Sequence, residues 1–125
     1  MTTSAIIFLI GRNMFGGYFV MMGLNHFGNH KMLTGYATSK KIPRPSLAVY
    51  LSGVLIFFGG VGIITNMYPF ASLALIMIFL IPVSFLIHSY WKNSDPMAKM
   101  TDMTHFFKNM ALIGATLMLT AYVLI

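Results

Sequence analysis

Four stretches of roughly twenty predominantly apolar residues run through this chain and constrain its fold more than any other feature. They cover about residues 5–27, 46–64, 69–90 and 104–125. As a helix, each is long enough to cross the ~30 Å hydrocarbon core of a bilayer. In lipid, a spanning segment must satisfy its backbone hydrogen bonds internally, which favours helices. The sequence therefore predicts an all-α integral membrane protein, with residues 1–125 forming a single four-helix bundle.

The scarcity of charge supports lipid as the natural solvent. Of the 125 residues, 58% are hydrophobic and 8% are charged, whereas a soluble domain carries about a quarter charged residues. The net charge of +6 comes from Lys and Arg residues, most of which flank the apolar stretches. There they orient the spans and meet anionic headgroups. We expect a lipid bilayer as the environment and no nucleic acid as a partner.

The connections between the stretches differ in length. Residues 65–68 predict a tight turn, so the second and third stretches form an antiparallel hairpin. The connection at residues 28–45 carries apolar residues at helical spacing opposite two lysines, which predicts a short amphipathic helix lying in the membrane interface. These residues are Met32, Leu33, Tyr36 and Ala37, opposite Lys31 and Lys40.

Local signals mark where the helices begin. Ser46 predicts an N-cap for the second span, and Pro69 suits the first position of the third. Asp95 followed by Pro96 predicts an N-cap and a helical lead-in that runs into the fourth span. Pro82, inside the third stretch, predicts a kink.

Charge also predicts the orientation. Lys and Arg gather in the connections at 28–45 and 91–103, whereas the middle connection and both tails hold none. By the positive-inside rule, these two loops are cytoplasmic and both termini lie outside a plasma or inner membrane.

The residue types that the chain lacks narrow the range of functions it can have. The chain has no Glu and no Cys, and its two acids, Asp95 and Asp102, lie between the predicted spans. A proton-coupled antiporter is disfavoured because such carriers usually hold a carboxylate within the membrane. Dithiol chemistry and iron–sulfur ligation by this chain are excluded. The four histidines show no metal-ligand spacing, so no metal site is predicted. A haem held by His88 and His105 is a weak alternative.

Arg12 is the charge that lies deepest in a predicted span, ~10 Å along the first helix at ~1.5 Å per residue. A charge at that depth costs at least ~2.5 kcal/mol unless it is paired or snorkels. No other span supplies a carboxylate. The candidate partners are carbonyls ending the second span, the carboxylate of Ile125, a lipid phosphate or a ligand oxygen. Two interpretations remain open. Arg12 either snorkels to the interface and holds the first span to neighbouring helix ends, or it binds a ligand.

A second polar group gathers at the predicted cytoplasmic ends of three spans. Antiparallel helices place these ends at one membrane level. The group could hold the carbonyls of a quinone headgroup, since His and Asn supply neutral donors and Trp a stacking face. The alternative is ordinary interface chemistry. The candidate residues are Asn25, His26, His88, Trp91, Lys108 and Asn109, with His105 nearby.

Small residues form a seam for helix packing. Ser46, Gly53 and Gly60 recur every seven residues on the second span, where another helix backbone can approach closely. Gly16, Gly17 and Gly23 can serve the same purpose on the first span. A closed monomer and a homo-oligomer are both compatible with this seam.

Four motifs in chain order resemble the DoxX family of small four-span bacterial membrane proteins. Gly11 to Phe27 is similar to the family's opening pattern of Gly-Arg, an apolar run, then Gly and a polar residue. Tyr36 to Pro45 resembles its Tyr-x-x-x-x-x-Ile-Pro-x-Pro connection. His88 to Trp91 resembles the end of its third span, and Phe106 to Leu112 the start of its fourth.

The resemblance implies quinone-linked oxidation or oxidative-stress defence, since some relatives are small subunits of a thiosulfate:quinone oxidoreductase. It favours a non-catalytic accessory component that binds quinone or a partner redox subunit, with no catalytic residue of its own. A membrane interaction or chaperone-like protein without a redox role is the alternative. One position departs from the family, because Ile56 stands where many members carry Glu. The residues that match the family's polar pattern are Arg12, Asn25, His88, Lys108 and Asn109.

Overall fold

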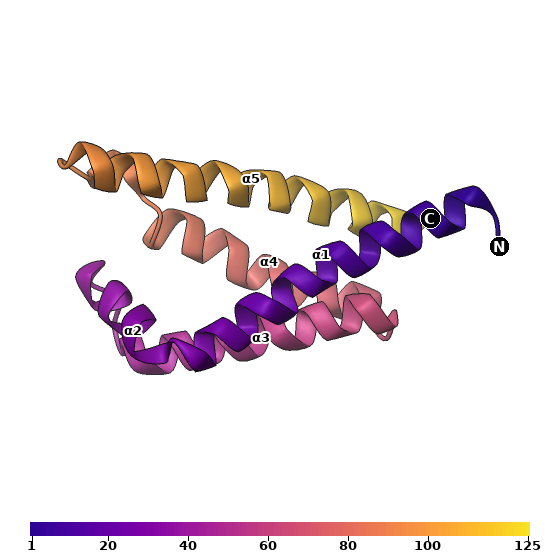
Figure 1. The fold of residues 1–125 in the computed structure, drawn as a ribbon, viewed down its shortest axis with the longest axis horizontal. Helices are drawn as coiled ribbons and strands as arrows, with labels where there is room; N and C mark the ends of the chain where they lie inside the picture. Colours follow the sequence, from indigo (N-terminus) through magenta and orange to yellow (C-terminus); the bar gives the residue numbers. More distant parts are fainter.

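The computed structural model describes all 125 residues and is entirely helical (Figure 1). Four of its helical segments are long and apolar enough to span a bilayer, and a short helix lies between the first two. The predicted fold class is therefore confirmed. In chain order the elements are α1 (Thr3–Gly28), α2 (His30–Ser39), α3 (Pro45–Thr65), α4 (Pro69–Leu86), the 3₁₀ helix η1 (Tyr90–Lys92) and α5 (Pro96–Leu124).

Two of the three predicted helix starts are right. Pro69 opens α4, and the Asp95 carboxylate caps α5 by accepting a hydrogen bond from the Ala98 N–H at 2.9 Å. The prediction for Ser46 is wrong, because α3 begins one residue earlier at Pro45, with Arg44 as its N-cap. Proline suits this first position because its fixed φ is preorganised for a helix and the N–H it lacks would be unpaired there.

The connection after α4 is longer than the sequence predicts. The third apolar stretch predicts a helix that continues to residue 90, but α4 ends at Leu86. The N–H of His88 then bonds the Val83 carbonyl at 3.1 Å, and the chain leaves the helical path before η1. This turn carries the His88 side chain towards α5, to which it hydrogen-bonds.

Backbone contact between glycines joins α1 to α3. A Cβ on Gly60 would lie 2.6 Å from the Gly16 carbonyl oxygen, and one on Gly23 would lie 2.9 Å from that of Gly53. Only residues without a side chain permit such an approach. The groove over Gly53 and Gly60 is thus occupied by α1 of the same chain, while Ser46 lies exposed beyond this contact, near α2.

The hydrophobic core is small and joins α1, α3 and α4. Ile56 is fully buried there. Many large apolar side chains face outward instead, as expected where lipid surrounds the chain. The core residues are Phe19, Ile56, Ile63, Leu73, Ile76 and Leu80.

The helices form a wedge (Figure 1). α5 packs against α4 and η1 and makes no backbone contact with α1 or α2. At one end, here called the terminal end, Phe8 of α1 meets Tyr122 of α5 with ring centroids 4.9 Å apart. At the other, the loop end, α2 and α5 lie well apart in the view.

Candidate functional site: an amphipathic cavity closed by a buried carboxylate

A cavity of about 660 Å³ occupies the wedge, and side chains from all five α-helices line it. Apolar residues such as Phe19, Leu55, Phe79 and Leu112 form most of its wall. The polar lining residues come mainly from the loop-end parts of α1, α2 and α5 and from the chain after α4. The cavity is therefore amphipathic along its length, the arrangement that an amphiphile with a polar head requires.

Five of the polar residues singled out from the sequence line this cavity, and two do not. Trp91 instead lies against aromatic rings of α4 and α5, with centroid distances of 6.2 Å to Phe85 and 5.5 Å to Phe106. Arg12 lines a different hollow at the terminal end. The five that line the cavity are Asn25, His26, His88, Lys108 and Asn109, and His105, expected nearby, lines it as well.

The amphipathic helix α2 turns its apolar face to the cavity. Met32, Leu33, Tyr36 and Ala37, which the sequence places on one face, all line it. The position of α2 at the loop end therefore makes it part of the cavity wall.

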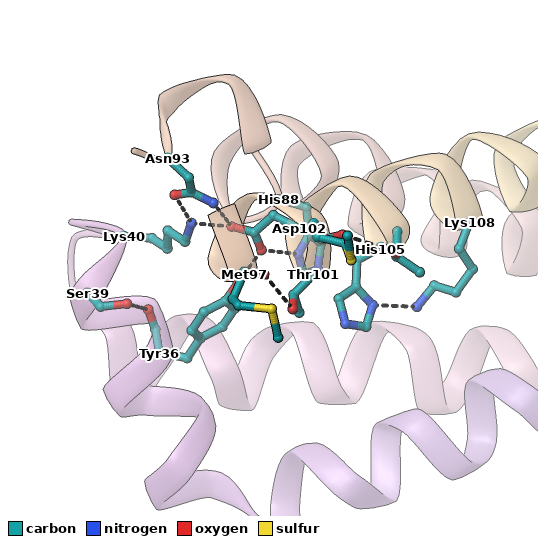
Figure 2. A network of polar contacts seen from close by, with 12 residues as sticks. Tyr36, Ser39, Lys40, His88, Asn93, Met97, Thr101, Asp102, His105 and Lys108 are labelled. Carbon is teal, nitrogen blue, oxygen red and sulfur yellow. Dashed lines mark hydrogen bonds and ion pairs between the residues drawn. The ribbon is translucent and has the colours of Figure 1, made fainter. Parts of the chain in front are cut away.

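Asp102 is the centre of a polar network that closes the loop end (Figure 2). Its side chain lies in α5, and the residue is 2% exposed. One carboxylate oxygen accepts from Lys40 Nζ and from Asn93 Nδ2, each at 2.6 Å. The other accepts from the Tyr36 hydroxyl and, at 3.2 Å, from His88 Nδ1. Because a carboxylate only accepts, His88 carries its proton on Nδ1.

These four donors connect parts of the chain that share no backbone contact. Tyr36 belongs to α2 and Lys40 is the C-cap of that helix, whereas His88 and Asn93 belong to the connection between α4 and α5. α2 and α5 do not pack directly, so the carboxylate of Asp102 carries the hydrogen bonds between them. His88 is in both the network and the cavity lining, and it thereby couples the two.

The sequence interpretation of the two acids needs correction at Asp102. The sequence predicts that both acids lie between the spans and assigns Asp102 no role, but α5 includes Asp102 and buries it. One signal was present in the sequence. With Asp95 committed as an N-cap, Asp102 is the only acid left to neutralise a lysine, although nothing in the spacing identifies Lys40 as its partner.

Burial keeps the Tyr36 hydroxyl of this network protonated. Burial, and secondarily the hydrogen bond and charge of Asp102, raise the pKa of Tyr36 above its ordinary value. The phenol therefore stays protonated at physiological pH and remains a donor to the carboxylate.

Polar contacts continue from Asp102 into the cavity. The rings of His88 and His105 stack with centroids 4.8 Å apart, and His105 Nδ1 lies 3.4 Å from Lys108 Nζ. The ammonium of Lys108 is also 5.6 Å from the centre of the Tyr18 ring. Stacked face to face, His88 and His105 do not present nitrogens to an iron between them, so the haem alternative gains no support.

The cavity offers hydrogen-bond donors that the protein leaves available. The Asn109 residue is 4% exposed, and its side-chain amide has no partner within the chain. The Lys108 ammonium keeps further donor capacity beside it. The site can thus bind a ligand that combines acceptor oxygens with a long apolar body.

These features define a class of protein: a multi-pass membrane protein whose four spans enclose an amphipathic cavity. The DoxX family model matches residues 7–89, well over half of the chain, so the protein belongs to the DoxX family. The match runs from α1 through α4, and the residues that α5 contributes to the site lie beyond it. No curated protein and no solved structure matches the chain.

Proposed function

We propose that this DoxX family protein binds a quinone-type amphiphile and acts as a non-catalytic component of a quinone-linked redox or oxidative-stress system. The observation that carries the proposal is the amphipathic cavity with available donors at its loop end and an apolar wall along the rest. A quinone matches this arrangement because it has carbonyl acceptors on a planar ring and an isoprenoid tail.

Each part of the cavity has a role in the proposal. Lys108 and Asn109 donate hydrogen bonds to a quinone carbonyl, and the Tyr18 ring contacts the quinone ring. The tail follows the apolar wall that includes Leu55 and Leu112. Since the chain has no cysteine, we assign electron transfer to a partner subunit.

The proposal places the loop end in the cytoplasm, where the Lys and Arg residues of the two charged connections favour it. The chain has no native cysteine, so single cysteines report orientation without background. In intact cells, a membrane-impermeant maleimide should label Thr2→Cys and leave Ser39→Cys unlabelled until the membrane is broken. The reverse pattern would refute this orientation.

Binding is tested by titrating a short-chain ubiquinone analogue into the purified protein in nanodiscs. Quenching of Trp91, the single tryptophan, reports occupancy. We expect Lys108→Met and Asn109→Leu each to weaken binding at least tenfold, because each removes a donor to the headgroup.

Matched controls make the same chemical changes outside the cavity. Lys99→Met and Asn13→Leu alter exposed residues that do not line it, and both should keep the affinity of the unchanged protein. Equal affinity in all four variants would contradict the proposed site. Equal binding of a fatty acid and the quinone would favour the non-redox interaction protein instead.

A further inference from the structure

The guanidinium of half-buried Arg12 contains a buried donor atom that the chain leaves without a partner. Its Nε is the one buried side-chain nitrogen or oxygen atom without a hydrogen-bond partner. The guanidinium forms no ion pair, since the two ion pairs present both involve Asp102. A buried, unpartnered donor on a permanent cation calls for an acceptor from outside the chain.

No side-chain acid lies at this end, and the terminal carboxylate of Ile125 forms no ion pair with Arg12. Asp95 caps the first turn of α5, and Asp102 is bound by four donors, so both carboxylates are committed at the loop end. The counter-charge of Arg12 therefore has to come from a molecule that the protein binds.

A hollow of about 560 Å³ lies beside Arg12, between the first turns of α1 and the last turns of α5. Its wall combines the hydroxyl-bearing residues Thr2 and Ser4 with the rings of Phe8 and Tyr122. Figure 1 shows this end of α1 beside the C-terminus of the chain. A cation and hydroxyls beside apolar rings fit a phosphate group attached to an apolar body.

We propose that Arg12 binds the phosphate of a phospholipid that stays attached to the protein at the terminal end. Arginine suits this role because its planar donors bind phosphate in a bidentate manner and it stays charged in a partly buried site. The acyl chains lie against the exposed apolar side chains of α1 and α5. This site is separate from the proposed quinone cavity and does not depend on it.

Native mass spectrometry of the detergent-purified protein tests the proposal. We expect one phosphatidylglycerol per chain to survive delipidation in the unchanged protein. Arg12→Gln should lower this retention at least tenfold, and Arg12→Lys should lower it less. The matched control is Arg44→Gln, which removes an arginine at the loop end and should leave retention unchanged.

A comparison on the unchanged protein avoids dependence on the folding of a variant. Delipidated protein is offered phosphatidylglycerol, diacylglycerol or inorganic phosphate. Preference for phosphatidylglycerol over diacylglycerol of at least tenfold supports the site. Equal retention of these two lipids, or an unchanged lipid count in Arg12→Gln, would overturn it. Thermal stabilisation by inorganic phosphate alone would assign the site to a soluble phosphate compound and overturn the lipid source.

Discussion

The two ends of the wedge each hold one buried or half-buried charge, and the protein treats them in opposite ways. At the loop end the Asp102 carboxylate receives four hydrogen bonds from two parts of the chain, α2 with its C-cap and the connection after α4. At the terminal end the Arg12 guanidinium receives no partner from the chain. The difference indicates that the Asp102 carboxylate holds the helices together, whereas the Arg12 guanidinium is available to bind a molecule outside the chain.

The largest effect is expected from neutralising the loop-end charge. Asp102→Asn removes the counter-charge of Lys40, which is itself largely buried. Removing one member of a buried ion pair costs about 3 kcal/mol or more. We expect a loss of about 3 kcal/mol in the free energy of unfolding, measured by circular dichroism during denaturation in detergent.

The matched control for that substitution is Asp95→Asn, since Asn caps a helix about as well as Asp. Its stability should stay within about 0.5 kcal/mol of the unchanged protein. If the two substitutions lowered the free energy of unfolding equally, the hydrogen bonds of Asp102 would not be what holds α2 against α5.

The terminal end is held by backbone contact, and a second prediction tests this. At Gly60 an added Cβ would lie 2.6 Å from the Gly16 oxygen, and neither backbone can move without separating α1 from α3. Gly60→Ala should therefore cost about 2 kcal/mol. Gly114→Ala meets open space and should be neutral or stabilising by up to about 1 kcal/mol. A neutral Gly60→Ala in the same denaturation assay would show that α1 is held in another way.

The contrast between the ends also explains what the sequence could predict. The apolar stretches, the glycine spacing and the Asp95–Pro96 signal act locally, so the spans and most helix starts are readable from the chain. The polar side chains that line the cavity were found because antiparallel spans bring their ends to one level. The Asp102 network joins residues as far apart as Tyr36 and Asp102, and no local pattern encodes that contact.

A third prediction measures one donor of the network. Tyr36→Phe removes the hydroxyl that bonds Asp102 and should cost about 1 kcal/mol. Because burial and this bond raise the pKa of Tyr36, its contribution is present below the ordinary tyrosine pKa and is lost as pH rises through the raised pKa. Stability should therefore fall more at strongly alkaline pH in the unchanged protein than in Tyr36→Phe.

Ultraviolet titration separates this effect from general alkaline unfolding. In the folded protein, Tyr36→Phe should leave the tyrosinate absorbance that develops around pH 10 unchanged. A loss of this absorbance in Tyr36→Phe would show that burial does not raise the pKa of Tyr36.

The smallest effect is expected at Arg12, and it is the most direct test of the comparison. In delipidated protein, Arg12→Gln removes no protein contact of the guanidinium, so the free energy of unfolding should change by less than about 0.5 kcal/mol. A ligand that binds only the folded state raises stability by mass action. Added phosphatidylglycerol should therefore stabilise the unchanged protein and not the variant. A large loss of unfolding free energy in delipidated Arg12→Gln would mean that the guanidinium has a partner within the chain. In that case both charges would hold helices together, and the two ends would differ only in the groups involved.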